Sequence, residues 1–359
     1  MRKLHSLRFL LPVFTFVCAQ AADQVVGGPF VVNVSARSAQ VVWVVKAGEA
    51  SLKAQGANAR LAPLLRSESV TFNGLKAGTV YEYGIPGHDD LKGTFKTPPA
   101  AGQPFEFVVY GDTRTRDDVH RKVVHAVLQY SNPEFILHTG DLVADGTDST
   151  LWPTFFDIEH DLLAKAVFFP SLGNHERNAR NYYDLLQVPA YYSFNWGNAH
   201  FAVLDTDIAN LANGESARQA SWKEQVQWLE EDLRKAQSAE FRFVSGHHPP
   251  MTAVSYRQGD NAHMTALEPM FEQMHVTAAF FGHDHNYQHY LKNGVHYVIA
   301  GGGGAPLYDV DKPPQGITVK VQSIENFVRI QVDGKVAHAM ALAPDGSKLD
   351  AFDVEGGAH

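Results

Sequence analysis

Five short motifs rich in metal-binding side chains recur along the chain, and most of them open on a glycine after a short apolar run. They are Gly111-Asp112-Thr113-Arg114, Gly140-Asp141, Gly173-Asn174-His175-Glu176, Gly246-His247-His248-Pro249 and Gly282-His283-Asp284-His285. A short apolar run is typical of a buried strand, and glycine lets the backbone turn sharply at its end. Because open α/β proteins keep their sites at the carboxyl ends of strands, we expect these side chains to gather at one sheet edge.

The apolar runs predict strands, and the segments between them predict helices. Strands are expected over residues 105–110, 135–138, 166–169, 241–244 and 278–281. Helices are expected from a cap at Asp117 and Asp118 to about Tyr130, from a cap at Ser221 through Val226, Leu229 and Leu233, and from Ala266 to Met274. Strands that alternate with helices favour a layered α/β sheet with mixed edges.

Aspartate, asparagine and histidine together are the donors that suit ions such as Zn, Fe and Mn. Two such ions about 3.5–4 Å apart can share a carboxylate and a hydroxide, which attacks phosphorus in line with the leaving group. Each motif alone is common by chance, and a buried histidine is usually just hydrogen-bonded. Five such turns in order are much harder to attribute to chance, so hydrolysis of a phosphate ester is the leading hypothesis.

The motif set resembles the calcineurin-like metallophosphoesterase superfamily, and especially its purple-acid-phosphatase-like branch, over about Phe105 to Gly304. The third and fifth motifs carry most of the resemblance, and Asn286-Tyr287 adds to it. The resemblance implies an α/β layered sandwich with two metal ions, most plausibly Fe, Zn or Mn. By position, Asp112, Asp141 and His285 would hold the first ion, and Asn174, His247 and His283 the second, with Asp141 bridging. His175 would meet the phosphate and protonate the leaving group, and His248 is a further candidate for substrate binding.

Two positions depart from the pattern of these relatives. Arg114 stands where most of the superfamily has histidine, and Ala144 stands where purple enzymes have a metal-binding tyrosine. The first ion is therefore expected to have fewer protein ligands than in these relatives, with water filling in. The colour that an iron-bound tyrosinate gives is not expected. Arg114 could clamp phosphate oxygens or pair with the carboxylate of Asp112 or Asp145, and both possibilities stay open. Asp145 itself could support the site or be a plain turn carboxylate.

The amino-terminal segment, residues 1–21, has the pattern of a signal peptide. A basic start is followed by the apolar run Phe9 to Val17 and the small-x-small box Ala19-Gln20-Ala21. The run is too short to span a bilayer. Cys18, the one cysteine, is not preceded by a small residue, so no lipid anchor is expected, and the mature chain would have no thiol or disulfide. A secreted or periplasmic location follows.

Three further regions are expected along the mature chain. Residues 22–97 show short strand patterns, and Leu75 to Tyr81 resembles the tyrosine-corner region of a fibronectin type III sandwich. Residues 98–103 are predicted to form a linker and residues 104–305 the catalytic domain. Residues 306–359 are predicted to form a β extension of the catalytic domain. Gly301-Gly302-Gly303-Gly304 favours a tight turn near the site, because no Gly-Lys-Ser/Thr follows it.

Three functions stay open. The first is a secreted phosphomonoesterase, the second a phosphodiesterase that includes nucleotides among its substrates, and the third a surface-binding protein on an inactive metal fold. The net charge of −9 without a long basic run argues against a nucleic-acid groove, so a small phosphate ester is the expected partner. The rim segments Thr206 to Ala220 and Met251 to His263 are the candidates for choosing between monoester and diester. The oligomeric state is left open.

Overall fold

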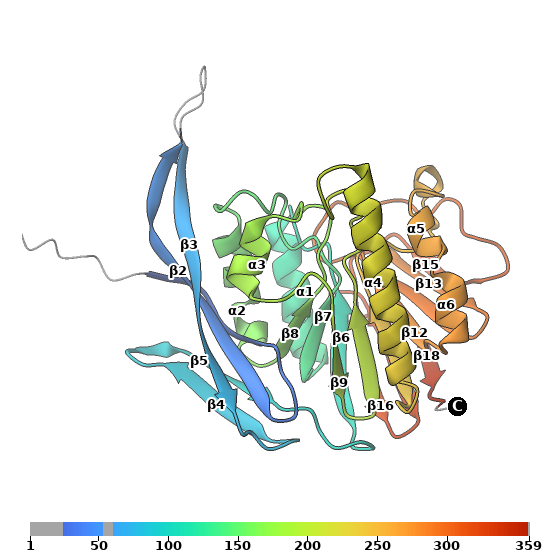
Figure 1. The fold of residues 1–359 in the computed structure, drawn as a ribbon, viewed down its shortest axis with the longest axis horizontal. Helices are drawn as coiled ribbons and strands as arrows, with labels where there is room; N and C mark the ends of the chain where they lie inside the picture. Colours follow the sequence, from blue (N-terminus) through green and yellow to red (C-terminus); the bar gives the residue numbers. More distant parts are fainter. Residues whose placement is uncertain (1–23, 53–59, 358–359) are drawn as a thin grey trace, which may run out of the picture.

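The computed structural model describes residues 24–52 and 60–357, in which two β-sheets pack face to face with helices on their outer sides (Figure 1). The expected signal peptide lies outside the described residues. Between the sheets lies one hydrophobic core, and each sheet packs a second apolar cluster against its own helices. The predicted layered α/β architecture is therefore present. No helix of the described residues is both long and apolar enough to cross a membrane.

The first sheet has nine strands in the order β18-β17-β16-β6-β7-β8-β1-β2-β3. Their bounds are Gln24–Val32 (β1), Ser38–Leu52 (β2), Arg60–Asn73 (β3), Phe105–Tyr110 (β6), Phe135–His138 (β7), Val167–Pro170 (β8), Phe327–Asp333 (β16), Val336–Leu342 (β17) and Lys348–Glu355 (β18). The central neighbours β6, β7 and β8 are parallel, and β16 runs antiparallel to β6. Parallel strands end at the same edge, which brings the turns after β6, β7 and β8 together.

The second sheet has seven strands in the order β15-β13-β14-β12-β11-β10-β9. Their bounds are Tyr192–Trp196 (β9), Ala199–Val203 (β10), Phe241–Ser245 (β11), Ala278–Phe281 (β12), Tyr287–Lys292 (β13), Val295–Ala300 (β14) and Thr318–Gln322 (β15). Strands β10, β11, β12 and β14 are parallel. Phenylalanines from both sheets interlock between them: the ring centroid of Phe107 lies 4.9 Å from that of Phe135 and 5.3 Å from that of Phe201. This aromatic packing holds the two sheets at a fixed spacing.

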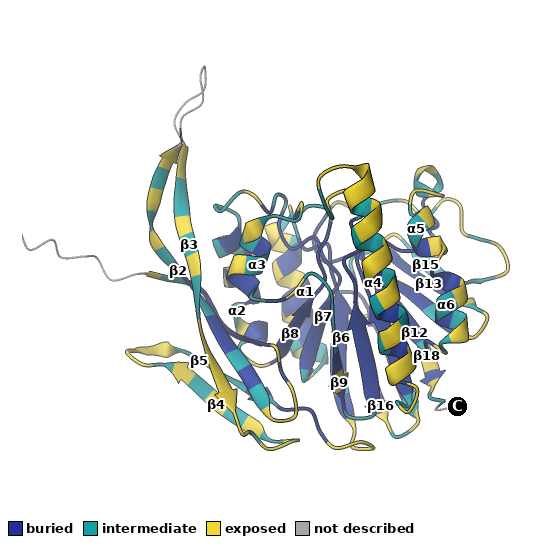
Figure 2. Ribbon diagram, in the orientation of Figure 1, coloured by how far each residue is buried: buried dark blue, intermediate teal, exposed yellow. Residues whose placement is uncertain are grey.

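Helices cover the outer faces, with their buried sides turned to the sheets (Figure 2). They are α1 Asp117–Tyr130, α2 Trp152–Leu163 and α3 Arg180–Leu186 on the first sheet, and α4 Glu215–Lys235, α5 Ala262–Thr265 and α6 Glu268–Gln273 on the second. Helix α1 ends at Tyr130 as predicted, but Asp117 and Asp118 lie in its first turn and do not cap it, because the N-cap residue is Arg116. Ser221 does not cap α4, which begins at Glu215, because the preceding residues are themselves good helix formers. The predicted third helix is shorter than expected and follows α5 closely.

The amino-terminal strands differ from the expected independent sandwich. Strand β1 pairs in parallel with β8, where Val31 faces Val167, so β1–β3 continue the first sheet. The strands β4 (Val80–Ile85) and β5 (His88–Lys96) form a separate two-stranded sheet. Both faces of β1 are buried: Val31 faces the core between the sheets, and Phe30 stacks on Phe156 of α2. The Tyr81 hydroxyl accepts a bond from the Lys76 amide, the local contact of a tyrosine corner, and Tyr81 packs against the core between the two large sheets.

The carboxy-terminal residues are divided between the two sheets. Strand β15 pairs with β13 in the second sheet, whereas β16, β17 and β18 extend the first sheet beyond β6. Strands β15 and β16 follow each other in the sequence but therefore belong to different sheets. A turn at Asp333-Gly334 closes the β16–β17 hairpin, where Asp333 pairs with Val336 and Gly334 has a φ of 59°.

Candidate metal centre

The five motifs meet at one edge of the paired sheets. Asp112, Asp141 and Asn174 follow β6, β7 and β8, and His247 and His283 follow β11 and β12. Hydrogen bonds join the turns directly: the Asp112 amide donates to the Gly140 carbonyl at 2.9 Å, and the Gly282 amide donates to the His247 carbonyl at 3.0 Å. Residues far apart in the sequence thus form one cluster of turns, as the strand-end pattern predicts.

Three of the predicted ligands have a left-handed backbone. Asp112 has a φ of 57°, Asp141 of 56° and His283 of 70°. This conformation costs a residue other than glycine on the order of 1–3 kcal/mol, and such residues cluster at functional sites. The strain points three side chains into one small volume, which indicates that this edge has a role other than stability.

The glycines before these ligands allow the turns to approach closely. A Cβ on Gly140, which has a φ of 94°, would lie 2.8 Å from Nδ1 of His247. A Cβ on Gly282 would lie 2.4 Å from a carboxylate oxygen of Asp112. The run Gly301–Gly304 passes behind the first motif, where the Gly303 amide donates to the Gly111 carbonyl at 3.0 Å. The run therefore lies near the site, as expected, and the chain bends at Gly303 and Gly304.

The second predicted ligand set converges closely. The amide oxygen of Asn174 lies 3.1 Å from Nε2 of His247 and 3.0 Å from Nδ1 of His283, and the two nitrogens are 3.3 Å apart. Nδ1 of His247 donates to the Thr139 carbonyl at 2.8 Å, so its Nε2 presents a lone pair to the cluster. An ion about 2.1 Å from each donor would place neighbouring donors about 3.0–3.4 Å apart. This donor set therefore fits a metal ion.

The first predicted set consists of Asp112, Asp141 and His285, all buried, with ligand atoms within 4.8 Å of one another. Nδ1 of His285 donates to the Pro306 carbonyl at 2.6 Å, and its Nε2 lies 3.5 Å from Oδ1 of Asp112. Burial and the neighbouring Asp141 raise the pKa of Asp112 well above its usual value. Two buried carboxylates side by side favour a bound cation, because the charged form of each is otherwise costly.

Asp141 lies between the two sets. Its Oδ1 is 3.4 Å from Nε2 of His247, and its other oxygen lies 3.1 Å from Nε of Arg114. Burial alone would raise the pKa of Asp141, but His247, His175 and Arg114 together lower it to about 2. The carboxylate therefore stays ionised between the sets, which is the placement expected of a bridging ligand.

Arg114 contacts a different carboxylate from those expected. Its Nε donates to Asp141, and its Nη2 lies 3.4 Å from Nε2 of His285. The predicted pairing with Asp112 or Asp145 is therefore wrong. Asp145 instead accepts bonds from Thr147 and pairs with Arg177 at 3.2 Å, as a plain turn carboxylate does. The guanidinium thus touches two of the three ligands of the first set.

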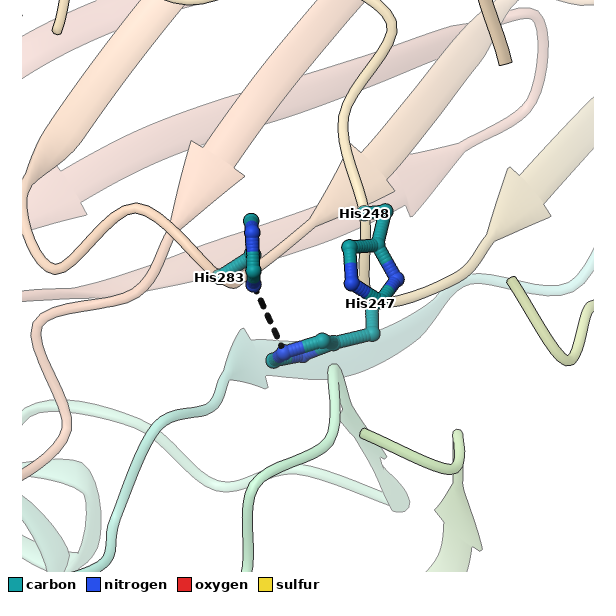
Figure 3. Close-up of side chains that lie close together, drawn as sticks. All are labelled: His247, His248 and His283. Atoms are coloured by element: carbon teal, nitrogen blue, oxygen red, sulfur yellow. Dashed lines mark hydrogen bonds between the residues drawn. The ribbon is translucent and has the colours of Figure 1, made fainter. Parts of the chain in front are cut away.

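The hydrogen bonds around Thr206 identify the tautomer of His248. The Thr206 hydroxyl oxygen accepts the amides of His247 and His248 at 3.1 and 2.8 Å, so its own proton is directed to Nδ1 of His248 at 3.1 Å. Nε2 of His248 then carries the proton. The nitrogens of His247, His248 and His283 also lie within 4.8 Å of one another, and Figure 3 shows the three rings together. Because Nε2 of His248 is a donor, Asn174 is the better third ligand and His248 the better hydrogen-bond donor.

His175 lies on the partly open side of the site. Its amide donates to Oδ1 of Asp141 at 2.9 Å, and its Nδ1 donates to the Ala144 carbonyl at 2.7 Å. The imidazole is therefore held from two directions, with 28% of the side chain exposed. Nε2 is the ring atom left to exchange a proton with a ligand in the site.

Glu176 has a role that the sequence analysis missed. This fully buried carboxylate accepts the amides of Asp141, Leu142 and Gly173 at 2.8–2.9 Å. Burial and the nearby Asp141 raise its pKa to about 8, against the effect of these donors. One side chain thus ties the turn after β7 to the turn after β8. Glu176 directly follows Asn174-His175 in the sequence, and this position was the available indication that it supports the site.

Two residues on the rim were also missed. Tyr308 stacks on the ring of His285, with centroids 4.1 Å apart. Arg257 donates to the Tyr308 hydroxyl at 3.2 Å and lies 3.6 Å from Asp284. Arg257 belongs to the predicted rim segment Met251 to His263, so its location was the signal. Tyr308 therefore packs against one face of the His285 ring, and Arg257 joins Tyr308 to Asp284.

The fold and this cluster define a metallophosphoesterase class, and the chain belongs to the calcineurin-like phosphoesterase family, whose model matches residues 105–287. Within that family it belongs to the purple-acid-phosphatase-like branch. It is 27% identical to purple acid phosphatase 21 of Arabidopsis thaliana over 257 residues, which cover 64% of this chain and 56% of that protein. It is 26% identical to human tartrate-resistant acid phosphatase type 5 over 219 residues, or 52% of this chain and 66% of that protein. The chain thus spans between about half and two thirds of these relatives.

The fold is also that of a solved plant enzyme. The structure of purple acid phosphatase PPD1 from yellow lupin seeds superposes with a TM-score of 0.72, covering 92% of this chain and 74% of that one at 16% identity. The purple acid phosphatase family implies a binuclear metal centre, and the two sets described above are the candidate groups for it.

Proposed function

We propose that this protein hydrolyses phosphate monoesters at a centre of two metal ions held by the two ligand sets. The observation that carries the proposal is the convergence of Asn174, His247 and His283 within 3.0–3.3 Å, with Asp141 alongside. When bound, such ions polarise a phosphoryl group and lower the pKa of a water molecule toward neutrality. Zn, Mn and Fe are the ions that best suit these nitrogen and oxygen donors.

The remaining side chains suit the handling of the ester. The Nε2 proton of His248 is available to a phosphoryl oxygen, because Thr206 fixes the tautomer. His175 would give a proton from Nε2 to the departing oxygen when its ring is in the imidazolium form, in which Nδ1–H stays bonded to the Ala144 carbonyl and Nε2 carries the second proton. Asp141 keeps both ligand sets at a fixed distance from each other. The chain therefore contributes binding, orientation and proton transfer around the ions.

The test is an assay of the purified mature protein after reconstitution with Zn, Mn or Fe. An aryl phosphate, a bis-aryl phosphate and nucleotides are offered as substrates at equal concentrations. We expect the highest kcat/KM on the aryl phosphate. A higher value on the bis-aryl phosphate or on nucleotides would favour the phosphodiesterase alternative, and no turnover with any metal would favour a non-catalytic binding protein.

Arg114 is expected to weaken binding of the first ion. Its guanidinium lies within 3.1–3.4 Å of two atoms that this ion needs, and its side chain is only 13% exposed. Like unit charges about 4 Å apart repel by roughly 4 kcal/mol at an effective dielectric constant of 20. Because the side chain can rotate away, we expect Arg114→Ala to raise the affinity of the first ion by about 10- to 100-fold.

Calorimetric titration of the metal-free protein with Zn²⁺ should show two binding steps. The weaker step belongs to the first ion, and its dissociation constant is compared between the wild type and Arg114→Ala. Arg121→Ala is the matched control, since Arg121 lies exposed on α1 and pairs with Asp157. Loss of metal from Arg114→Ala would instead show that the arginine supports the ligands and does not compete with the ion.

Export of the protein is proposed from residues 1–21 alone. The basic start, apolar run and Ala19-Gln20-Ala21 box support cleavage before Ala22. Intact-mass measurement on protein recovered outside the cytoplasm should give a chain that begins at Ala22. A chain that keeps Phe9 to Val17 would contradict the proposal.

A further inference from the structure

A cavity of about 330 Å³ opens beside the metal centre, between the start of α1, the start of α2 and the turn after β7. Apolar side chains form the larger part of its wall area, and Thr113, Thr154 and His120 complete the inner wall; the apolar residues are Leu142, Val143, Ala144, Leu151, Phe155 and Ile158. Arg114, Thr115 and Asp117 lie at its more exposed side. A volume near 300 Å³ is at the small end of the range for ligand pockets, so it suits a compact group.

Two residues join this cavity to the site. Arg114 lines the cavity and also contacts Asp141 and His285. Ala144 also lines the cavity, and its carbonyl accepts a hydrogen bond from Nδ1 of His175. The cavity therefore shares one residue with the first ligand set's surroundings and one with the support of the proposed proton donor. The small side chain at position 144 is what leaves part of this volume open.

The residues around the cavity disfavour a charged ligand group. Inside the apolar walls a charged group would lose its hydration without a partner, which is costly. The one cation at the edge, Arg114, is engaged with Asp141, and Asp117 lies nearby and would repel a second anion. His120 belongs to the wall, but its Nε2 is bonded to the buried Glu159. An uncharged apolar group fits these surroundings best.

We infer that this cavity binds the organic part of the substrate, and that this part is a compact apolar group such as a single aromatic ring. The inference rests on the proposed function, since it assigns the ester group of that substrate. Adding or removing one methylene in an apolar pocket typically changes discrimination by about 10–200-fold. We therefore expect an aromatic ring to improve binding by about 10-fold or more over a methyl group.

The test compares two non-hydrolysable probes, phenylphosphonate and methylphosphonate, by calorimetry on the zinc-loaded protein. Phenylphosphonate is expected to bind at least about 10-fold more tightly to the wild type. Ala144→Phe should fill the cavity and reduce this ratio to near one. Ala164→Phe is the matched control, since Ala164 is half-buried at the opposite end of α2, and it should keep the ratio. Leu151→Gln, which makes the wall polar, serves as a second variant if Ala144→Phe fails to fold.

The outcomes separate the cavity from the proposed function. Equal binding of both probes to the wild type, or a ratio that survives Ala144→Phe and Leu151→Gln, overturns the inference even if phosphate esters are hydrolysed. A preference for phenylphosphonate that is lost in the variants supports the cavity even if no ester is turned over. In that last case the proposed function alone would fail.

Discussion

Asp141→Asn should reduce turnover of an aryl phosphate by about 10³-fold or more, and it should lower the metal content. The neutral amide keeps the shape of the side chain and can still accept the His175 amide, so the turn after β7 should persist. It removes the charge that lies 3.4 Å from His247 and beside Asp112 and His285. Metal ions contribute several kcal/mol of charge stabilisation in such reactions, and each 1.36 kcal/mol is tenfold in rate.

Elemental analysis and steady-state kinetics on the same sample measure both effects. Asp145→Asn is the matched control, because Asp145 is a turn carboxylate that pairs with Arg177 and contacts neither ligand set. It should keep its metal and its activity. Full metal content in Asp141→Asn would show that this carboxylate does not bridge.

His175→Ala should slow the hydrolysis of esters with poor leaving groups by about 10²–10⁴-fold, the usual contribution of a positioned acid. Esters whose leaving groups need no proton should be affected far less. The reason is the position of His175, whose amide and Nδ1 are held by Asp141 and Ala144 and whose Nε2 lies 3.9 Å from Asp141 without a hydrogen bond. Metal content should stay normal, because His175 belongs to neither ligand set.

The effect is measured with a series of substituted phenyl phosphates. In His175→Ala, kcat/KM should depend more steeply on the acidity of the leaving group than in the wild type. His338→Ala provides the control, since His338 lies exposed on β17 and pairs with Asp353. Equal losses across the series would show that His175 binds the phosphate without protonating the leaving group.

The ligand positions could be predicted from sequence because their signal is local. A glycine that ends an apolar run, followed by aspartate or histidine, specifies both a strand end and a donor, as at Gly140-Asp141 and Gly282-His283. The structure places these donors together. The contacts of Arg114 could not be predicted, since a long side chain can reach any neighbouring turn and the order of the strands decides which one. Glu176 was missed for the same reason: its partner amide at Asp141 lies 35 residues away.

Most strands and helices could be predicted from the sequence, but which strands pair with each other could not. A short apolar run indicated a strand around Val31, but nothing local shows that this strand pairs with β8 and joins the catalytic sheet. A tyrosine corner at Tyr81 is likewise a short-range contact, which forms here without a separate sandwich. Helix α2 was overlooked although Trp152, Phe155, Phe156 and Leu162 recur at helical spacing and are buried. Which strands pair and which helices pack together depends on the whole chain, so a local sequence pattern does not predict it.

A crystal structure of the zinc-loaded protein, with anomalous difference data collected at the zinc edge, tests the central claim most directly. We predict two peaks about 3.5–4 Å apart with Asp141 between them, one beside Asp112 and His285 and the other beside His247 and His283. A single peak, with the Arg114 guanidinium still bonded to Asp141, would contradict the two-ion account, and the absence of any peak at this edge of the sheets would contradict the metal centre altogether.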